Sequence, residues 1–404
     1  MNILVDGYNI GLPAGTGVAT YGRGFIQSAR ALGHRVELLY GLDNLPADDG
    51  RTRSGLEAVR RSARKLIDFV QAPFGLSITP IEPEHINANL SVPDVDLIWN
   101  RARLFRAAKG AYRRTGLFTA VDAPHIDVAH WTYPLPIYVK GAKNIYTIHD
   151  IVPIKHPEFV KNSSEFRKLC TDIRDRADHI ITVSETSRTD IIDHLQFSPD
   201  HITNTYQIVP HIVEDENEHR HNILDKNRLT PDGYFLFFGA IEPKKNLFRL
   251  LQAYKNSDIS TPLVVVGRPA WQCEQDVAML RMLKDHPEKN VIWLNYLPRA
   301  DLLNLIRSAR AVLFPSLYEG FGLPALEAMA IGTPVLTADV GALREVVDDA
   351  ALLIDPLSIS SIGNGLRLLD RDGALRKSLS TKGRARADFF SQTQYERRLG
   401  ALLR

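Results

Sequence analysis

Cysteine and long apolar stretches are both scarce in this sequence. The only two cysteines, Cys170 and Cys273, lie far apart, which excludes a disulfide framework and a cysteine-based metal site and is typical of a reducing cytosol. No apolar run approaches the roughly 20 residues that a membrane-spanning helix needs. Met1 is followed at once by the strand-like run Ile3–Val5, so we expect no secretory signal peptide and a cytoplasmic location.

An excess of either charge is also lacking. There are 49 Lys and Arg against 47 Asp and Glu, a formal net charge of +2, so no overall basic surface is present and no nucleic-acid partner is expected. Hydrophobic residues make up 44% and charged residues 24%, the balance of a folded globular chain. A chain of 404 residues is expected to form two domains.

Short apolar runs alternate with longer segments of helical periodicity. Such runs, bounded by Gly, Pro or Asp, are typical of buried parallel strands. The repeated β-α-β order predicts an α/β protein with two doubly wound parallel sheets. The predicted strands are Ile3–Val5, Val36–Tyr40, Asp127–His130, Asn144–Ile148, His179–Val183, Tyr234–Phe238, Leu263–Val266, Val291–Leu294, Ala311–Phe314, Pro334–Leu336 and Ala351–Ile354.

A polar segment, residues 213–232, interrupts this pattern and is expected to be a solvated linker. We therefore place one domain at residues 1–212 and a second at residues 233–385. The last residues, 386–404, are expected to form a terminal helix. Parallel sheets bind ligands beyond the carboxyl ends of their strands, so the functional site is expected in the cleft between the domains.

The most informative segment follows the predicted strand that ends at Phe314. Pro324 suits the first position of the next helix, and Gly332 suits the position just past its end. Gly320 and Gly322, in the turn between strand and helix, allow the backbone to approach a ligand closely. The free amides and the dipole of the helix N-terminus favour an anion such as a diphosphate.

Two carboxylates, Glu319 and Glu327, accompany this helix N-terminus. One precedes the helix and the other lies inside it, so together they could bind hydroxyls on two parts of one ligand. The alternative is that both acids only complement the helix dipole.

A second motif follows the first strand of the second domain. Gly239 permits a tight exit from the strand, and Asn246 can cap the helix that comes next. Lys244 and Lys245 would then lie over the cleft, where lysine can neutralise a leaving diphosphate. The alternative is an ordinary solvated lysine pair.

The first domain offers two further candidates. His149 ends a predicted strand on the cleft side and could contact the reacting sugar or phosphate, although a buried structural histidine is the alternative. Gly15 and Gly17 follow the first strand and could surround part of a donor or acceptor, unless they belong to an ordinary mobile loop.

Together these segments resemble the retaining glycosyltransferases of family 4, which have the GT-B fold, and especially the mannosyltransferase-like members that build bacterial surface polysaccharides such as O-antigen, capsule and exopolysaccharide. The resemblance extends over nearly the whole chain, and Glu319 and Glu327 reproduce the family's Glu-x7-Glu motif. The supporting segments are Pro315–Pro324, Glu242–Asn246, Val266–Trp271, Thr147–Asp150 and Gly15–Gly17.

The resemblance implies a role for each of these residues. Glu327 would bind the donor ribose, Glu319 would contact the transferred sugar, and Lys245 would neutralise the diphosphate with help from Lys244. His149 would lie by the reaction centre. The remaining candidates are Gly239, Gly267, Phe321, Gly322, Leu323, Tyr296 and Leu297 on the donor side, and Gly15, Gly17 and Asp150 on the acceptor side.

The resemblance also implies a terminal helix that crosses back to the first domain, and it has exceptions. Ala240 stands where the family often has Arg, which leaves more of the phosphate charge to the two lysines. Gln392 stands where Trp is common, and Val209–Ile212 replaces the usual Asn-Gly. None of these positions affects the glutamate pair.

Breaking the bond between a sugar and a nucleoside diphosphate places negative charge on the leaving oxygen. The lysines and the helix N-terminus can stabilise that charge, so we expect no metal and no cofactor beyond the nucleotide sugar. Asp94 and Asp96 form the nearest match to a metal-binding Asp-x-Asp motif, but they are expected to lie in a solvated turn. The resemblance implies retention of the anomeric configuration, by front-face attack of an acceptor hydroxyl.

Residues 51–116 carry 12 Lys or Arg against 6 acids and suggest a contact with anionic lipid at the inner membrane. A lipid-diphosphate-linked acceptor would be located there. The alternative is a solvated basic face.

GDP-mannose is the expected donor by resemblance, with UDP-, dTDP- or other GDP-linked sugars as alternatives. Other classes considered are a nucleotide-sugar epimerase and a non-catalytic nucleotide-sugar-binding subunit. A Rossmann dehydrogenase is disfavoured because Thr20 replaces the third glycine and Glu37 lies inside its strand.

Overall fold

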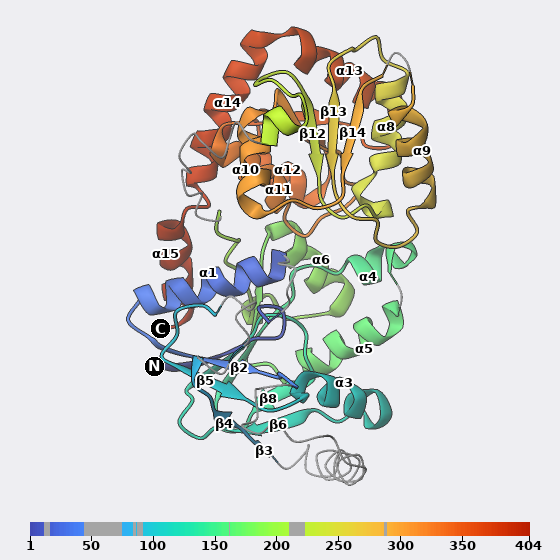
Figure 1. Ribbon diagram of the computed structural model, residues 1–404. Helices are drawn as coiled ribbons and strands as arrows, with labels where there is room; N and C mark the ends of the chain where they lie inside the picture. Colours follow the sequence, from blue (N-terminus) through green and yellow to red (C-terminus); the bar gives the residue numbers. More distant parts are fainter. Residues whose placement is uncertain are drawn as a thin grey trace, which may run out of the picture.

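The computed structural model describes residues 1–11, 17–43, 75–83, 86, 92–160, 162–209, 223–286 and 289–404. Its two domains lie one above the other, and both chain ends lie at the first domain (Figure 1). Gly15, the first half of the predicted linker and much of the basic stretch 51–116 lie outside the described residues.

The first domain is built on an eight-stranded sheet in the order β11-β10-β9-β7-β1-β2-β5-β4. All its strand pairs are parallel except β4 with β5. The apolar runs of the sequence became its central strands because both faces of those strands are buried. The strands are β1 (Asn2–Asp6), β2 (Arg35–Tyr40), β4 (Thr79–Pro80), β5 (Leu97–Asn100), β7 (Val128–Trp131), β9 (Lys143–Thr147), β10 (His179–Thr182) and β11 (Ile202–Asn204).

Helices cover this sheet, and a small parallel sheet in the order β3-β6-β8 lies beside it. The strands of the small sheet are β3 (Leu76–Ser77), β6 (Thr119–Asp122) and β8 (Ile137–Val139). The helices are α1 (Gly17–Ala31), α3 (Leu104–Thr115), α4 (Val152–Lys155), α5 (Ser163–Arg174) and α6 (Glu185–Leu195).

The second domain contains a fully parallel six-stranded sheet in the order β14-β13-β12-β15-β16-β17. The direction of strand addition reverses between β12 and β15, so the loops that follow these two neighbouring strands form the topological switch point, the place where doubly wound sheets bind ligands. The strands are β12 (Phe235–Phe238), β13 (Leu263–Val266), β14 (Val291–Leu294), β15 (Ala311–Phe314), β16 (Val335–Ala338) and β17 (Leu352–Ile354).

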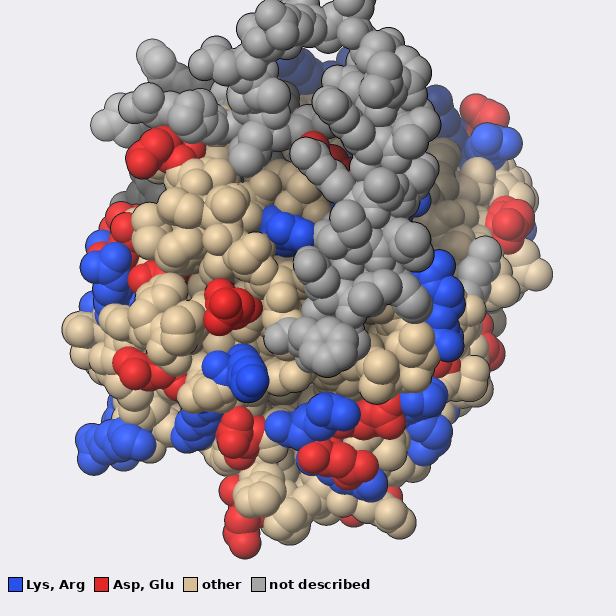
Figure 2. Space-filling model, turned by 90° about the horizontal axis from the view of Figure 1, so that it is seen from below, with Lys and Arg blue, Asp and Glu red and all other residues tan. Residues whose placement is uncertain are grey.

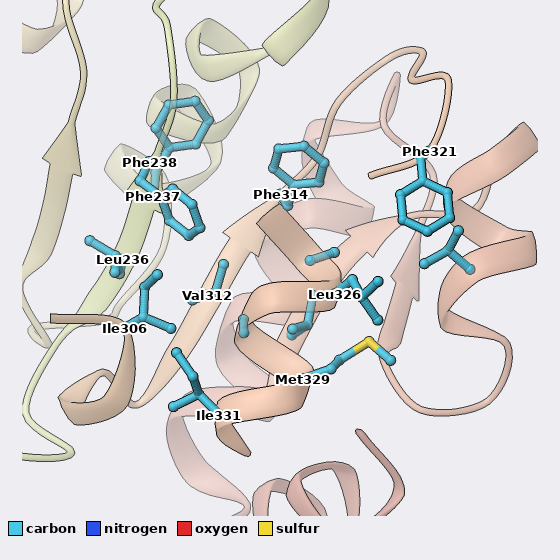
Figure 3. Packing of buried hydrophobic residues seen from close by; sticks show 14 of the residues in the cluster. Leu236, Phe237, Phe238, Ile306, Val312, Phe314, Phe321, Leu326, Met329 and Ile331 are labelled. Atoms are coloured by element: carbon cyan, nitrogen blue, oxygen red, sulfur yellow. The ribbon is translucent and has the colours of Figure 1, made fainter. Parts of the chain in front are cut away.

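Helices α10 and α11 pack over strands β12 and β15 of this sheet (Figure 3). Leu326 of α11, Ile306 of α10 and Val312 of β15 are each fully buried there, and each such side chain contributes roughly 1.5–3 kcal/mol. This core fixes the two loops at the switch point. The helices are α8 (Leu247–Lys255), α9 (Glu274–Lys284), α10 (Arg299–Ser308), α11 (Leu323–Ile331), α12 (Gly341–Val347), α13 (Ile359–Arg371) and α14 (Gly373–Asp388).

The final helix, α15 (Gln392–Leu402), returns to the first domain and lies beside α1 (Figure 1). Tyr395 and Leu399 on its inner face are buried. At the other connection, Ile223, Leu224 and Leu229 are buried in the core that includes the second sheet, so this part of the predicted linker is not solvated.

Candidate active site

The loops after β12 and β15 bring two lysines to one glutamate. Nζ of Lys245 lies 2.6 Å from Oε1 of Glu319, and Nζ of Lys244 lies 3.9 Å from Oε2 of the same side chain. Lys244 also lies 3.6 Å from Oε1 of Glu242. Two of the residues predicted to be catalytic, Lys245 and Glu319, therefore meet at the topological switch point of the second sheet.

The charges in this cluster depend on one another. Burial alone would raise the pKa of the Glu319 carboxyl, but the charges of Lys245 and Lys244 and a hydrogen bond from Lys245 hold that pKa below its ordinary value. The negative charge of Glu319 in turn raises the pKa of Lys244 despite its burial. The two lysines thus remain charged although they are largely buried. Their attraction for an anion is stronger there than in water, because the surrounding protein screens charge less.

Glu319 lies in the turn that leads into α11. Gly322 begins this helix with φ +100°, a left-handed conformation that glycine adopts without strain, and Gly332 ends it in a similar conformation. Leu323 is the first helical residue and Pro324 the second, close to the predicted position of the proline. The side chain of Phe321 is buried, and its ring centroid lies 5.4 Å from that of Phe390, so its ring is part of the packing and not a ligand contact.

Glu327 lies one turn further into α11 and is nearly buried. Its carboxylate accepts two hydrogen bonds from Arg299, the first residue of α10: Nη2 to Oε1 at 2.7 Å and Nη1 to Oε2 at 3.1 Å. Sequence reasoning singled out Glu327 but missed this partner.

The remaining donor-side candidates line the ends of β12, β13 and β14. Gly239 and Gly267 approach so closely that a Cβ on Gly267 would lie 1.9 Å from the carbonyl oxygen of Gly239. Leu297 is half-buried, whereas Tyr296 is 60% exposed with the guanidinium of Arg268 4.7 Å from its ring centroid. An exposed aromatic ring beside an arginine offers a planar surface on which a nucleotide base can stack.

Asn246 does not cap α8 as predicted. It lies at the N-cap position in a left-handed conformation, but its side chain accepts no hydrogen bond from a helix amide. Its Oδ1 accepts one from Nη1 of Arg249 at 3.0 Å. Its Nδ2 donates instead to the carbonyl oxygens of Pro315, at 3.0 Å, and Pro356, at 2.7 Å. Asn246 therefore ties the lysine loop to the loop that carries Glu319.

His149 faces this cluster from the first domain. Its Nε2 donates to the backbone oxygen of Thr132 at 2.9 Å, and its ring stands edge-on to Tyr21 with centroids 4.9 Å apart. Burial lowers the pKa of His149, while the bond to Thr132 and the charge of Asp150 oppose that shift. The donated bond leaves Nδ1 of a neutral ring as an acceptor.

A buried acid supports the backbone beside His149. Asp6, at the end of β1, accepts hydrogen bonds from the amides of Thr132 and Tyr8. Burial raises the pKa of Asp6 to about 6. Sequence reasoning did not select Asp6; its signal was an acid that directly follows the apolar run of the first strand.

The two domains contact each other beside Glu319. Gly320 lies against His149 and Asp150, and its carbonyl oxygen accepts hydrogen bonds from Ser184 at 2.8 Å and Ser187 at 3.2 Å at the start of α6. His149 and Asp150 thus meet Lys244 and Glu319 across the cleft.

A cavity of about 260 Å³ lies between the domains at this contact. Val18 lines it, one residue after Gly17, the exposed first residue of α1. His149, Asp150, Glu242 and Lys244 supply its polar wall. Its aromatic side chains are Tyr133, Phe159, Phe166 and Trp271. Glu242 and Trp271 lay in segments that the sequence singled out, but no role had been predicted for them.

The residues that the structure describes contain no group of three or more His, Cys, Asp or Glu side chains suited to hold a metal ion. Asp94 and Asp96 instead form ion pairs with Arg30, at 3.4 and 3.6 Å. Both cysteines, Cys170 and Cys273, are buried and free.

Much of the described part of the basic stretch is already paired. Arg113 binds Glu165 at 2.6 Å, and Lys109 donates to the hydroxyl of Tyr8 at 2.8 Å. Figure 2 shows Lys and Arg side chains interspersed with Asp and Glu on the lower face. Within the described ranges, no helix is both long and apolar enough to cross a membrane.

Comparison with known proteins identifies a glycosyltransferase domain in this chain. Residues 219–386 match the family described as "Glycosyl transferases group 1". O-antigen chain mannosyltransferase B of Escherichia coli is 35% identical over 61% of this chain and 66% of its own length. The MMP alpha-(1->4)-mannosyltransferase of Mycolicibacterium hassiacum is 27% identical over 92% of this chain and 90% of its own. Serotype-specific mannosyltransferase WbdA of Escherichia coli is matched over only 33% of its length.

Solved structures share the whole fold. HepE from Anabaena, in complex with UDP and glucose, superposes with a TM-score of 0.67 at 15% identity and covers 100% of this chain and 99% of its own. WaaG, a glycosyltransferase involved in lipopolysaccharide biosynthesis, has a TM-score of 0.60 at 16% identity over 100% and 99%. The predicted GT-B fold is confirmed.

Proposed function

We propose that this chain is a retaining, metal-independent glycosyltransferase of family 4 that transfers a hexose from a nucleoside diphosphate to a hydroxyl of a glycan or lipid-linked oligosaccharide in bacterial surface polysaccharide synthesis. The observation that carries the proposal is the cluster of Lys244, Lys245 and Glu319 at the N-terminus of α11, opposite His149. The mannosyltransferase names of the relatives support mannose as the sugar. The family resemblance adds GDP-mannose as the proposed donor.

The proposed reaction follows from where charge develops. The bond between the sugar C1 and the phosphate oxygen breaks, and its electron pair stays on the diphosphate. Lys245, Lys244 and the free amides at Gly322 and Leu323 stabilise that charge. The acceptor hydroxyl attacks C1 from the same face and transfers its proton to the leaving phosphate oxygen.

The interdomain cavity supports a neutral sugar ring as the part of the acceptor that enters the site. Aromatic rings such as Trp271 and Phe159 present flat apolar surfaces to a sugar, while Asp150 and Glu242 can accept hydrogen bonds from its hydroxyls. The same two carboxylates repel a phosphate. A lipid diphosphate, if the acceptor carries one, would lie outside this cavity.

Peripheral attachment of a cytoplasmic enzyme to the inner membrane remains part of the proposal, carried by the excess of basic residues in 51–116. Binding of the chain to vesicles of anionic and of neutral lipid tests it. Equal binding to both contradicts it.

The proposed function is tested by thermal shift with GDP, UDP, dTDP, ADP and their common sugars, on the wild type and Glu327→Ala. A nucleotide at 100 times its dissociation constant adds about 2.7 kcal/mol. Stabilisation by one base, lost in Glu327→Ala, is the expected result. Absence of any shift in the wild type contradicts the proposal.

A further inference from the structure

The ion pair between Arg299 and Glu327 uses both oxygens of the carboxylate. One guanidinium nitrogen donates to each oxygen, at 2.7 and 3.1 Å. This arrangement places two parallel donors on one edge of the carboxylate. Among the described residues, Glu327 is the only side chain that Arg299 contacts through a hydrogen bond or ion pair.

A ribose also offers two neighbouring donors, its 2′- and 3′-hydroxyls. A cis-diol that binds both oxygens of a carboxylate uses the same edge as a guanidinium, so the two compete for that edge of Glu327. The Glu327 side chain is 7% exposed and fixed in the core of α11, whereas the Arg299 side chain is 47% exposed. Arg299 is therefore the partner that can move out into water.

We propose that Arg299 is a latch on the donor site. It compensates the buried charge of Glu327 while the site is empty, it is displaced by the ribose diol of the incoming nucleoside diphosphate, and it returns as the nucleotide product leaves. This inference rests on the proposed function and adds a residue that regulates the affinity for the nucleotide.

Such a latch weakens nucleotide binding, and that assists turnover. Binding the nucleotide equally in substrate, transition state and product lowers KM without raising kcat, and a tightly held product leaves slowly. A cation that competes for Glu327 favours product release. The backbone need not move, because α10 is held by Leu305 and Ile306, both fully buried.

The latch is tested by calorimetric titration of GDP, UDP and their 2′,3′-dideoxy analogues into the wild type, Arg299→Ala and Arg299→Lys. Arg299→Ala is expected to bind the preferred ribonucleotide about tenfold more tightly, since the diol no longer displaces a charged partner. The dideoxy analogue should bind the wild type and Arg299→Ala equally, because it lacks the diol that displaces Arg299. Arg299→Lys should fall between them.

Arg307→Ala is the matched control, because Arg307 lies at the far end of the same helix and contacts Asn304. It should leave the affinity for both nucleotides unchanged. In steady-state assays of Arg299→Ala, the donor KM and the product inhibition constant should fall together, by about tenfold, while kcat does not rise.

Three results would overturn the latch. Weaker ribonucleotide binding by Arg299→Ala would mean that Arg299 is a direct contact. A lower melting temperature with an unchanged ratio of ribonucleotide to dideoxynucleotide affinity would mean that Arg299 has only a structural role. Failure of the wild type to bind any nucleotide would overturn the proposed function together with the latch.

Discussion

Gly320 of the second domain lies against Asp150 of the first: a Cβ added to Gly320 would lie 2.8 Å from Oδ2 of Asp150. Gly320 directly follows Glu319, and Asp150 directly follows His149. This tight contact between the two domains thus occurs one residue away from the groups proposed to carry the reaction.

The variant Gly320→Ala is expected to lower kcat by roughly tenfold to 10²-fold, because the added methyl group separates the reacting groups by a fraction of an ångström. Nucleotide affinity should change little, since the donor site lies within the second domain. Steady-state kinetics and nucleotide titration measure the two effects. Gly373→Ala, at an exposed start of α14 with room for the methyl group, is the control. Equal losses in both variants would contradict this expectation.

Replacing Lys245 by alanine is expected to lower turnover by about 10²–10³-fold, the scale for losing one donor to a developing oxyanion. Lys244→Ala should have a smaller effect, because its Nζ lies 3.9 Å rather than 2.6 Å from Glu319. The exposed Lys255 supplies a control variant, Lys255→Ala. A larger loss from Lys244→Ala than from Lys245→Ala would reverse the proposed assignment.

Trp271→Ala is expected to raise the KM for the acceptor by about tenfold, because the cavity loses an aromatic surface for the sugar. Transfer of the sugar to water should continue at its wild-type rate. Both are measured by release of nucleotide with and without a neutral oligosaccharide. An unchanged acceptor KM together with a changed donor KM would place Trp271 on the donor side instead.

Activity is expected to persist after extensive treatment with EDTA, because fixed positive charge takes the place of a metal in the proposed mechanism. The assay is sugar transfer before and after chelation and after addition of Mn²⁺ or Mg²⁺. Loss of activity that either ion restores would refute metal independence.

Stability is expected to fall on acidification because of His130. Burial lowers the pKa of this histidine from 6.5 to about 3, so it must stay neutral in the folded state. Below pH 6.5 the unfolded chain binds a proton that the folded chain does not, and this removes about 2 kcal/mol by pH 5. Burial raises the pKa of Asp6 to about 6, which favours the folded state on acidification and partly offsets this loss.

The contribution of His130 is therefore measured as the difference in the free energy of unfolding between the wild type and a variant without this histidine. Chemical unfolding of the wild type and His130→Gln at several pH values should show a weaker loss on acidification in the variant. The reference is Asp6→Asn, in which the offsetting acid is removed. A parallel pH dependence of the wild type and His130→Gln would contradict the assignment.

Strands with both faces buried were predictable from the sequence. The runs Leu263–Val266 and Ala311–Phe314 match β13 and β15 residue for residue, because only apolar side chains suit such strands. In the described part of the chain, six short strands were missed: β3, β4, β5, β6, β8 and β11. In β4, for example, Thr79 and Pro80 are exposed and form no apolar run. A run of about four or more apolar residues therefore predicts a strand, whereas a strand of two to four residues without such a run is not recognised.

The site was predictable to the extent that it depends on short motifs. The pairing of Lys245 with Glu319 follows from the adjacency of β12 and β15, which the α/β pattern implies. The bond from Arg299 to Glu327 depends on how two helices pack, and no local pattern indicates it. The expectation for Asn246 was wrong for the same reason, since its partners are carbonyl oxygens of distant loops.

The polypeptide passes between the domains twice, once between β11 and β12 and again between α14 and α15. The two passes are joined where the amide of Val209 donates to the carbonyl oxygen of Phe390 at 3.0 Å. Two covalent connections held side by side define an axis between the domains, whereas a single connection would be only one pivot point. Sliding or free rotation of one domain over the other is thereby opposed, and a swing about that axis remains. A closing motion about that axis would bring Gly320 and Asp150 together.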